Sequence, residues 1–127
     1  MVNNILTDIR IQHGRQLIEG IDSLNLSLKA ALWLYDSSID KWRLILSFPM
    51  LHQRGTRYFY KTVQSLLLKF PERIISLQDI SIIDYNETFI TLLKGAIKIG
   101  PGPATARFTN SFINGIRVDD ALVYRML

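Results

Sequence analysis

The segment from Leu26 to Phe48, LSLKAALWLYDSSIDKWRLILSF, constrains the fold more than any other part of the chain. Apolar residues alternate with other residues along two runs, and these runs flank a polar loop from Asp36 to Lys41. Alternation with a period of two is typical of a β-strand, and two such runs around a short polar loop predict a β-hairpin. We therefore expect this hairpin to form the centre of a sheet.

The two faces of the expected hairpin differ in composition. On the first strand one face is wholly apolar, with Leu26, Leu28, Ala30, Leu32 and Leu34, and the other is mixed, with Ser27, Lys29, Ala31, Trp33 and Tyr35. On the second strand Trp42, Leu44, Leu46 and Phe48 oppose Arg43, Ile45 and Ser47. Aromatic side chains on a mixed face indicate that something covers it, either another element of this chain or a second subunit.

An amphipathic helix is expected from about Asn4 to Leu24, with Asn3 or Asn4 as its cap. Its apolar stripe consists of Leu6, Ile9, Leu17, Ile21 and Leu24, and Gly14 lies in the middle, where a break is an alternative. Ile11 and Ile18 are expected to project away from the stripe, either as ordinary exposed residues or as part of a protein contact. The interface candidates are thus Ile11, Ile18, Trp33, Tyr35 and Ile45.

Two further helices and one strand are expected in the middle of the chain. Thr56 is expected to cap a helix with apolar positions Phe59, Val63, Leu66, Leu67 and Phe70, which Pro71 ends. A strand follows around Ser81 to Asp84; a start near Ile74 with an interruption at Gln78-Asp79 is the alternative. The spacing of Asp84 and Glu87 predicts a capping box that starts the next helix, and Gly100-Pro101 is expected to close it.

Two strands are expected between Gly102 and Leu127, because Asn114-Gly115 is a strong signal for a two-residue hairpin turn. A strict two-residue loop would place Phe108 and Phe112 on the same face as Arg117 and Asp119. A bulge, or a turn at Asp119-Asp120, is the alternative. The complete order αββαβαββ predicts a single α+β domain over residues 1–127, with two layers, about three helices and a mainly antiparallel sheet of about five strands.

The segment from Arg54 to Lys61 is the candidate anion-binding site, formed by Arg54, Gly55, Thr56, Arg57 and Lys61. Glycine lets a ligand approach the backbone, a helix N-terminus offers N–H donors, and arginines grip oxyanions. The alternative is a capped loop with solvated arginines. Tyr58 and Tyr60 alternate with the cations, so single-stranded nucleic acid is a further possible partner, although no nucleic-acid-binding motif is present.

Composition argues against several classes of function. The chain has no cysteine and only two histidines, so we expect no disulfide, no zinc site of the cysteine and histidine type and no cofactor. We find no catalytic motif; a pocket that joined Asp119, Asp120 or His52 to an arginine would favour an enzyme. The N-terminal residues lack the pattern of a secretory signal, and no apolar run is long enough for a membrane span, so we expect a cytoplasmic protein.

Three stretches resemble a group of small bacterial proteins of unassigned function: LWLYDSSIDKWRLILSFP, the GxxxxY pattern from Gly55 to Tyr60, and NGIRVDDALVYR. The resemblance covers most of the chain and implies a stand-alone domain, but no activity, cofactor or catalytic residue. In that group the residues around the glycine tend to be acidic, whereas here they include Arg54 and Arg57.

From these observations we expect a protein-interaction or homo-oligomerising module that acts through the mixed face of the hairpin. The alternative is a binder of a small anion, nucleotide or nucleic acid that acts through the basic segment. The net charge of +4 mildly favours polyanions.

Overall fold

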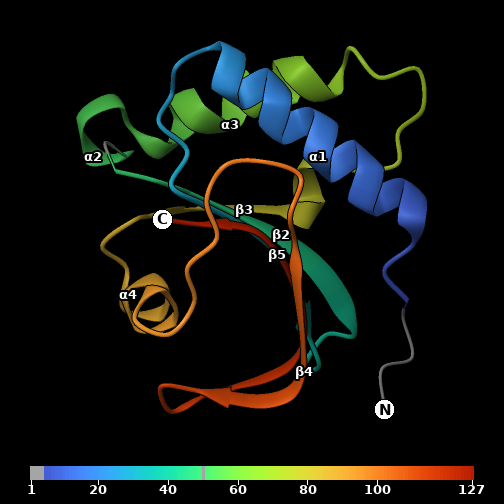
Figure 1. Ribbon diagram of the computed structural model, residues 1–127. Coiled ribbons are helices and arrows are strands. Elements are labelled where there is room, and N and C mark those ends of the chain that lie inside the picture. Colours follow the sequence, from blue (N-terminus) through green and yellow to red (C-terminus); the bar gives the residue numbers. More distant parts are fainter. Residues whose placement is uncertain (1–4, 50) are drawn as a thin grey trace.

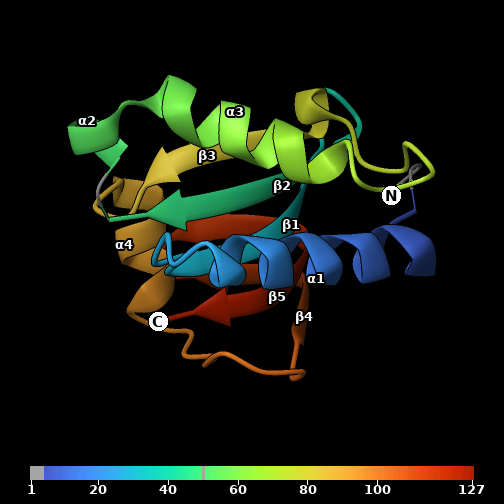
Figure 2. The same ribbon diagram turned by 90° about the horizontal axis from the view of Figure 1, so that it is seen from above.

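The structure is a computed structural model that describes residues 5–49 and 51–127. Its elements are α1 (Asp8–Ser23), β1 (Ala30–Asp36), β2 (Lys41–Phe48), α2 (Leu51–Arg54), α3 (Thr56–Leu67), a 3-10 helix (Leu77–Asp79), β3 (Ile80–Asp84), α4 (Thr88–Lys94), β4 (Ala106–Ile113) and β5 (Ile116–Met126). The α+β class is confirmed, and the five strands form one sheet in the order β3-β2-β1-β5-β4 (Figures 1 and 2).

The sheet is mixed. The pairs β1–β2, β1–β5 and β4–β5 are antiparallel, whereas β2 and β3 are parallel. A parallel neighbour needs a crossover that returns the chain to the starting end of the first strand, and α3 provides this crossover between β2 and β3. The run of strand, helix and strand in the sequence was therefore the signal of a parallel pair.

Helices cover both faces of the sheet, so the prediction of two layers is wrong. Helices α1 and α3 lie on one face and α4 lies on the other (Figures 1 and 2). The reason is that β1 is buried on both sides: Trp33 packs in the cluster beneath α1 and α3, and Leu32 packs in a second cluster with Ile90 and Leu93 of α4. A strand buried on both faces needs a layer on each.

The central hairpin is confirmed, with Asp36 paired to Lys41 at its loop end. Its first strand begins at Ala30, later than predicted, because Asn25 and Ser27 have φ angles of 55° and 58° and interrupt the extended backbone. Leu26 and Leu28 consequently join the cluster under α1 and α3, on the opposite side from Leu32.

Helix α1 starts at Asp8, and the Oγ1 of Thr7 caps it by accepting the N–H of Arg10 at 3.3 Å. The predicted caps Asn3 and Asn4 lie outside the described residues. The helix runs unbroken through Gly14, and its buried face consists of Gly14, Leu17, Ile18 and Ile21. Ile9 and Leu24, which were predicted to belong to the buried stripe, are exposed.

The strict two-residue turn at Asn114-Gly115 is confirmed, since Ile113 pairs with Ile116 and both turn residues have positive φ, 47° and 83°. Phe112 therefore lies opposite Arg117 and is 73% exposed. Nearer the base of the hairpin the alternation of side chains between the two faces of β5 is interrupted. Val118 and Ala121 are three residues apart, yet they belong to the same buried cluster. On the facing strand β4, Asn110 has a positive φ of 46°, and the hairpin is twisted at this level.

The limits predicted for α4 are wrong at both ends. It starts at Thr88 with Glu87 as its N-cap, and no side-chain bond caps it, because the Asp84 carboxylate instead accepts the N–H of Asn86. It ends at Lys94, well before Gly100, because Ile99 exchanges two backbone hydrogen bonds with Met126 and so draws the chain to the sheet. The capping box that does form lies at Ser76–Asp79.

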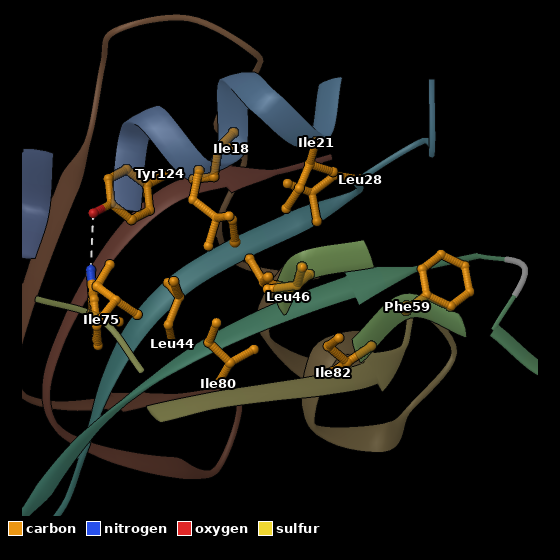
Figure 3. Close-up of a cluster of buried hydrophobic side chains, with 14 of the residues drawn as sticks. Ile18, Ile21, Leu28, Leu44, Leu46, Phe59, Ile75, Ile80, Ile82 and Tyr124 are labelled. Carbon is orange, nitrogen blue, oxygen red and sulfur yellow. Dashed lines mark hydrogen bonds between the residues drawn. The ribbon is translucent and has the colours of Figure 1, made fainter. Parts of the chain in front are cut away.

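A bulge in β5 places two consecutive side chains against α1. Ala31 pairs with Arg125 and Leu32 with Val123, so Tyr124 is the extra residue. The Tyr124 hydroxyl accepts the indole N–H of Trp33 at 2.9 Å, drawn as the dashed line in Figure 3, and donates to the carbonyl oxygen of Ile11 at 2.7 Å. Arg125 grips both carboxylate oxygens of Asp22 at 2.9 and 2.7 Å.

Gly14 permits this contact between helix and sheet. A Cβ at this position would lie 2.3 Å from the Tyr124 hydroxyl and 3.1 Å from the Trp33 indole nitrogen. Both rings are buried and neither can withdraw freely. Glycine at this position therefore allows α1 to approach the sheet closely. The resulting contact outweighs the helix propensity that alanine would add.

We predict that Gly14→Ala lowers the free energy of unfolding by about 1–3 kcal/mol, because overpacking forces Tyr124 and Trp33 apart. Gly20→Ala is the matched control in the same helix, since its Cβ would meet only the movable end of Leu66, at 3.2 Å. Urea unfolding followed by circular dichroism measures both variants. Equal stability of the two variants would contradict the packing role of Gly14.

We also predict a loss of stability in alkaline solution. Burial raises the pKa of Tyr124 to about 12, although the hydrogen bond from Trp33 and the charge of Arg15 act in the opposite direction. In the unfolded chain the pKa is about 10, so the contribution of the neutral phenol is complete below pH 10 and is lost as the pH rises towards 12. Over this range we expect the free energy of unfolding to fall by about 2–3 kcal/mol more in the native chain than in Tyr124→Phe. Urea titrations at several pH values measure the difference, and parallel curves would refute it.

Candidate functional site

The predicted anion-binding segment forms the joint between α2 and α3. Gly55 closes α2 by donating its N–H to Leu51, and its φ of 85° turns the chain into α3. Gly55 is therefore the N-cap and Thr56 is the first helical residue, so the prediction that Thr56 caps the helix is wrong. The left-handed conformation that glycine accepts readily explains the difference.

The cations of this segment are exposed along the start of α3. Arg54 is engaged within the segment: it donates to the Tyr58 hydroxyl at 2.9 Å and lies over the Tyr58 ring. Arg57 and Lys61 are exposed to solvent. Tyr60 faces the fold instead, and its hydroxyl accepts the N–H of Ile82 at 3.1 Å, so it is not free to stack on a base. Anion binding here stays a prediction.

The five interface candidates lie in or beside the two cores of the chain. Ile18, Trp33 and Tyr35 are buried under α1 and α3, Ile11 packs against the same cluster, and Ile45 is buried on the α4 side. The mixed face of the hairpin is thus covered by helices of this chain, with Trp33 at 0% exposure. Ile18 is buried because the close approach at Gly14 turns that side of α1 towards the sheet.

Strand β4 is an open edge of the sheet, with β5 as its only strand partner among the described residues. In a two-residue hairpin the residues that flank the turn, Ile113 and Ile116, share hydrogen bonds with each other. The next residue, Phe112, therefore directs its backbone N–H and C=O away from β5 towards the open edge. Phe112 is 73% exposed, and the centroid of its ring lies 5.7 Å from the guanidinium carbon of Arg117.

The opposite edge, β3, is shorter and is partly closed by α3. Its five residues lie beside α3 in Figure 2, and the N–H of Ile82 on its outer side is bonded to the Tyr60 hydroxyl. An edge whose donors are already paired is a poor template for another strand. The open edge of β4 is therefore the better candidate for association with a further strand.

A polar cavity lies where the turn after β1 meets the twisted part of the β4–β5 hairpin. Its volume is about 430 Å³, and we call it the hairpin cavity. It is lined by Tyr35, Ser37, Thr109, Asn110, Arg117, Asp119 and Asp120. The cavity thus joins Asp119 and Asp120 to an arginine, Arg117, while His52 is not part of it.

Each carboxylate of the hairpin cavity is held by an arginine. Arg107 donates to both oxygens of the buried Asp120, at 2.6 and 2.8 Å, and this hydrogen bonding raises the pKa of Arg107 despite partial burial. Arg117 Nε donates to Asp119 Oδ1 at 2.8 Å. Hydrogen bonds from Arg117 and Ser37 lower the pKa of Asp119, although slight desolvation opposes them.

This arrangement favours binding over proton transfer. A general acid or base works best with a pKa near the working pH, and the pKa of Asp119 is shifted in the other direction. Both oxygens of Asp120 are occupied by Arg107. The cavity is therefore lined by one guanidinium group, of Arg117, and two carboxylates, and Arg107 outside the lining neutralises that of Asp120.

We predict that Arg117→Gln raises the pKa of Asp119 towards its usual range, because the variant removes both the strongest hydrogen bond and a positive charge. Carboxyl carbon chemical shifts recorded through an acid titration measure this pKa. Arg107→Gln is the control, since it leaves the pair of Arg117 and Asp119 in place. An unchanged titration in Arg117→Gln would show that this pair does not form in solution.

Within residues 5–49 and 51–127, no group of three or more histidine, aspartate or glutamate side chains is placed to hold a metal ion. No helix of this part of the chain is long and apolar enough to cross a membrane. Comparisons with models of known protein families, with curated proteins and with solved structures found no match. The resemblance to small bacterial proteins stays a prediction. The functional proposal below is therefore based on the edge of β4 and on the hairpin cavity.

Proposed function

We propose that this protein is a cytoplasmic homo-oligomerising interaction module, in which a second copy of the chain adds to the sheet at β4. The supporting observation is the open edge of β4 with Phe112 exposed beside its turn. Strand addition satisfies the outward N–H and C=O groups of an edge, and it is a common mode of protein association.

Phe112 is the anchor of this contact. Burying a phenylalanine side chain fully is worth about 1.5–3 kcal/mol relative to leaving it in water. In a two-fold dimer the same strand of each copy meets the other, so each Phe112 contributes to the interface. Aromatic residues that become buried in an interface often contribute much of the binding energy.

The charges and shape of β4 favour a closed dimer over a fibril. Arg107 is the only charged residue of the strand, and Asp120 neutralises it, so two copies repel each other weakly. Pairing of β4 with β4 uses both open edges, while α3 covers the β3 edges. The positive φ at Asn110 also kinks the edge, which disfavours continuous stacking of further strands.

We predict that the native chain sediments with twice the mass of one chain and that Phe112→Lys sediments with the mass of a single chain, because the lysine carries a charge into the contact. Analytical ultracentrifugation over a concentration series measures both. The matched control is Leu68→Lys, another exposed apolar residue, located after α3 on the helical face; it should remain dimeric. A native chain that is a monomer at its highest soluble concentration would refute the proposal.

A further inference from the structure

We propose that the hairpin cavity binds a small zwitterion of the α-amino acid class, with its carboxylate on Arg117 and its ammonium group on Asp119. The site shares residues of β4 with the proposed dimer contact, but its argument does not depend on dimer formation. Four properties of the cavity carry it: size, balance of charge, unused hydrogen-bonding capacity and a lining of neutral polar groups.

The volume suits a small molecule. At about 430 Å³ the cavity falls within the range of about 300–1,000 Å³ that is typical of ligand pockets. Its walls come from three separate parts of the chain: the end of β1 with the following turn, β4, and β5. The twist of the hairpin at Asn110 and at Asp119-Asp120 holds these parts around a common space.

The balance of charge selects a neutral ligand that carries both signs. A simple anion that reached Arg117 would also meet the carboxylates of Asp119 and Asp120. A simple cation that reached Asp119 would meet the guanidinium group of Arg117, and the charge of Asp120 is already neutralised by Arg107. A zwitterion adds no net charge, and each of its ends can face a group of opposite sign.

Both members of the exposed pair retain hydrogen-bonding capacity. Arg117 uses Nε for Asp119, and among the described residues no hydrogen bond engages its two terminal nitrogens, which can hold a carboxylate. An ionised carboxylate can accept about four hydrogen bonds, so Asp119 can accept from an ammonium group in addition to its bonds from Arg117 and Ser37. The lowered pKa of Asp119 keeps this carboxylate charged at neutral pH.

The remaining lining favours a polar side chain on the ligand. Ser37, Thr109 and Asn110 add hydroxyl and amide groups that can donate and accept. Asp120 is fixed by Arg107 and shapes the wall without offering a free charge. An amino acid such as serine therefore matches the cavity better than an aliphatic one.

The test is a titration of the 15N-labelled chain, followed by amide spectra, with glycine, L-serine, acetate and methylammonium at constant ionic strength. Acetate and methylammonium each carry one of the two charges of glycine. We expect glycine and L-serine to shift the amides of Ser37, Asn110 and Asp119 with saturation, L-serine more tightly, and the single-charge probes to bind at least about tenfold more weakly.

Two variants test the assigned contacts. Arg117→Gln and Asp119→Asn should each weaken the binding of L-serine by about tenfold or more. Lys98→Gln, which removes an exposed cation after α4 that does not line the cavity, should leave it unchanged. The proposal is overturned if neither zwitterion saturates the shifts, if acetate binds as tightly as glycine, or if Arg117→Gln binds L-serine like the native chain.

Discussion

The hydroxyl of Tyr124 joins α1, β1 and β5, and the arrangement of the helical layer depends on it. It accepts from the Trp33 indole and donates to the carbonyl oxygen of Ile11. Without it a buried indole N–H would lose its partner, at a cost of about 1–3 kcal/mol. The contact needs a glycine at position 14, and it brings that side of α1 to the sheet, so that Ile18 is buried and Ile9 is not.

Because helices cover both faces of the sheet, the surfaces open to partners lie elsewhere. The aromatic and aliphatic residues of the central hairpin, including Trp33 and Ile45, are buried in the two cores. What remains is the edge at β4 and the space beneath the twist of the β4–β5 hairpin. Both belong to the same hairpin, which is held to the rest of the chain by β1 on one side and, through Asn114, by the carbonyl oxygen of Leu92 on the other.

Local patterns predicted the local structure well. The alternation around the loop at Asp36–Lys41, the apolar stripe of α3 and the Asn114-Gly115 turn each depend on neighbours in the sequence, and each is present. The predicted end of α4 is wrong because Ile99 forms backbone hydrogen bonds with a distant residue, Met126. Local pattern carries no information about such a partner.

The side on which each residue is buried, and the composition of the candidate site, depend on contacts over long distances in the sequence. Trp33 is in the core because α1 and α3 fold over it, which alternation alone could not distinguish from burial by a second subunit. The hairpin cavity joins Ser37 to Asp119, which the sequence separates widely. The signal in the sequence was the pair of adjacent carboxylates at 119 and 120, for which an arginine was the expected partner in a pocket.

The position of β5 has a consequence for how the chain acquires its structure during synthesis. It comes last of the five strands along the chain, yet it lies between β1 and β4. The bond between Trp33 and Tyr124 spans 91 positions, and such distant contacts slow folding. Until β5 leaves the ribosome, β1 keeps an unpaired side and the indole of Trp33 lacks its partner, so the core between the sheet and α1 can be completed only after β5 has been made.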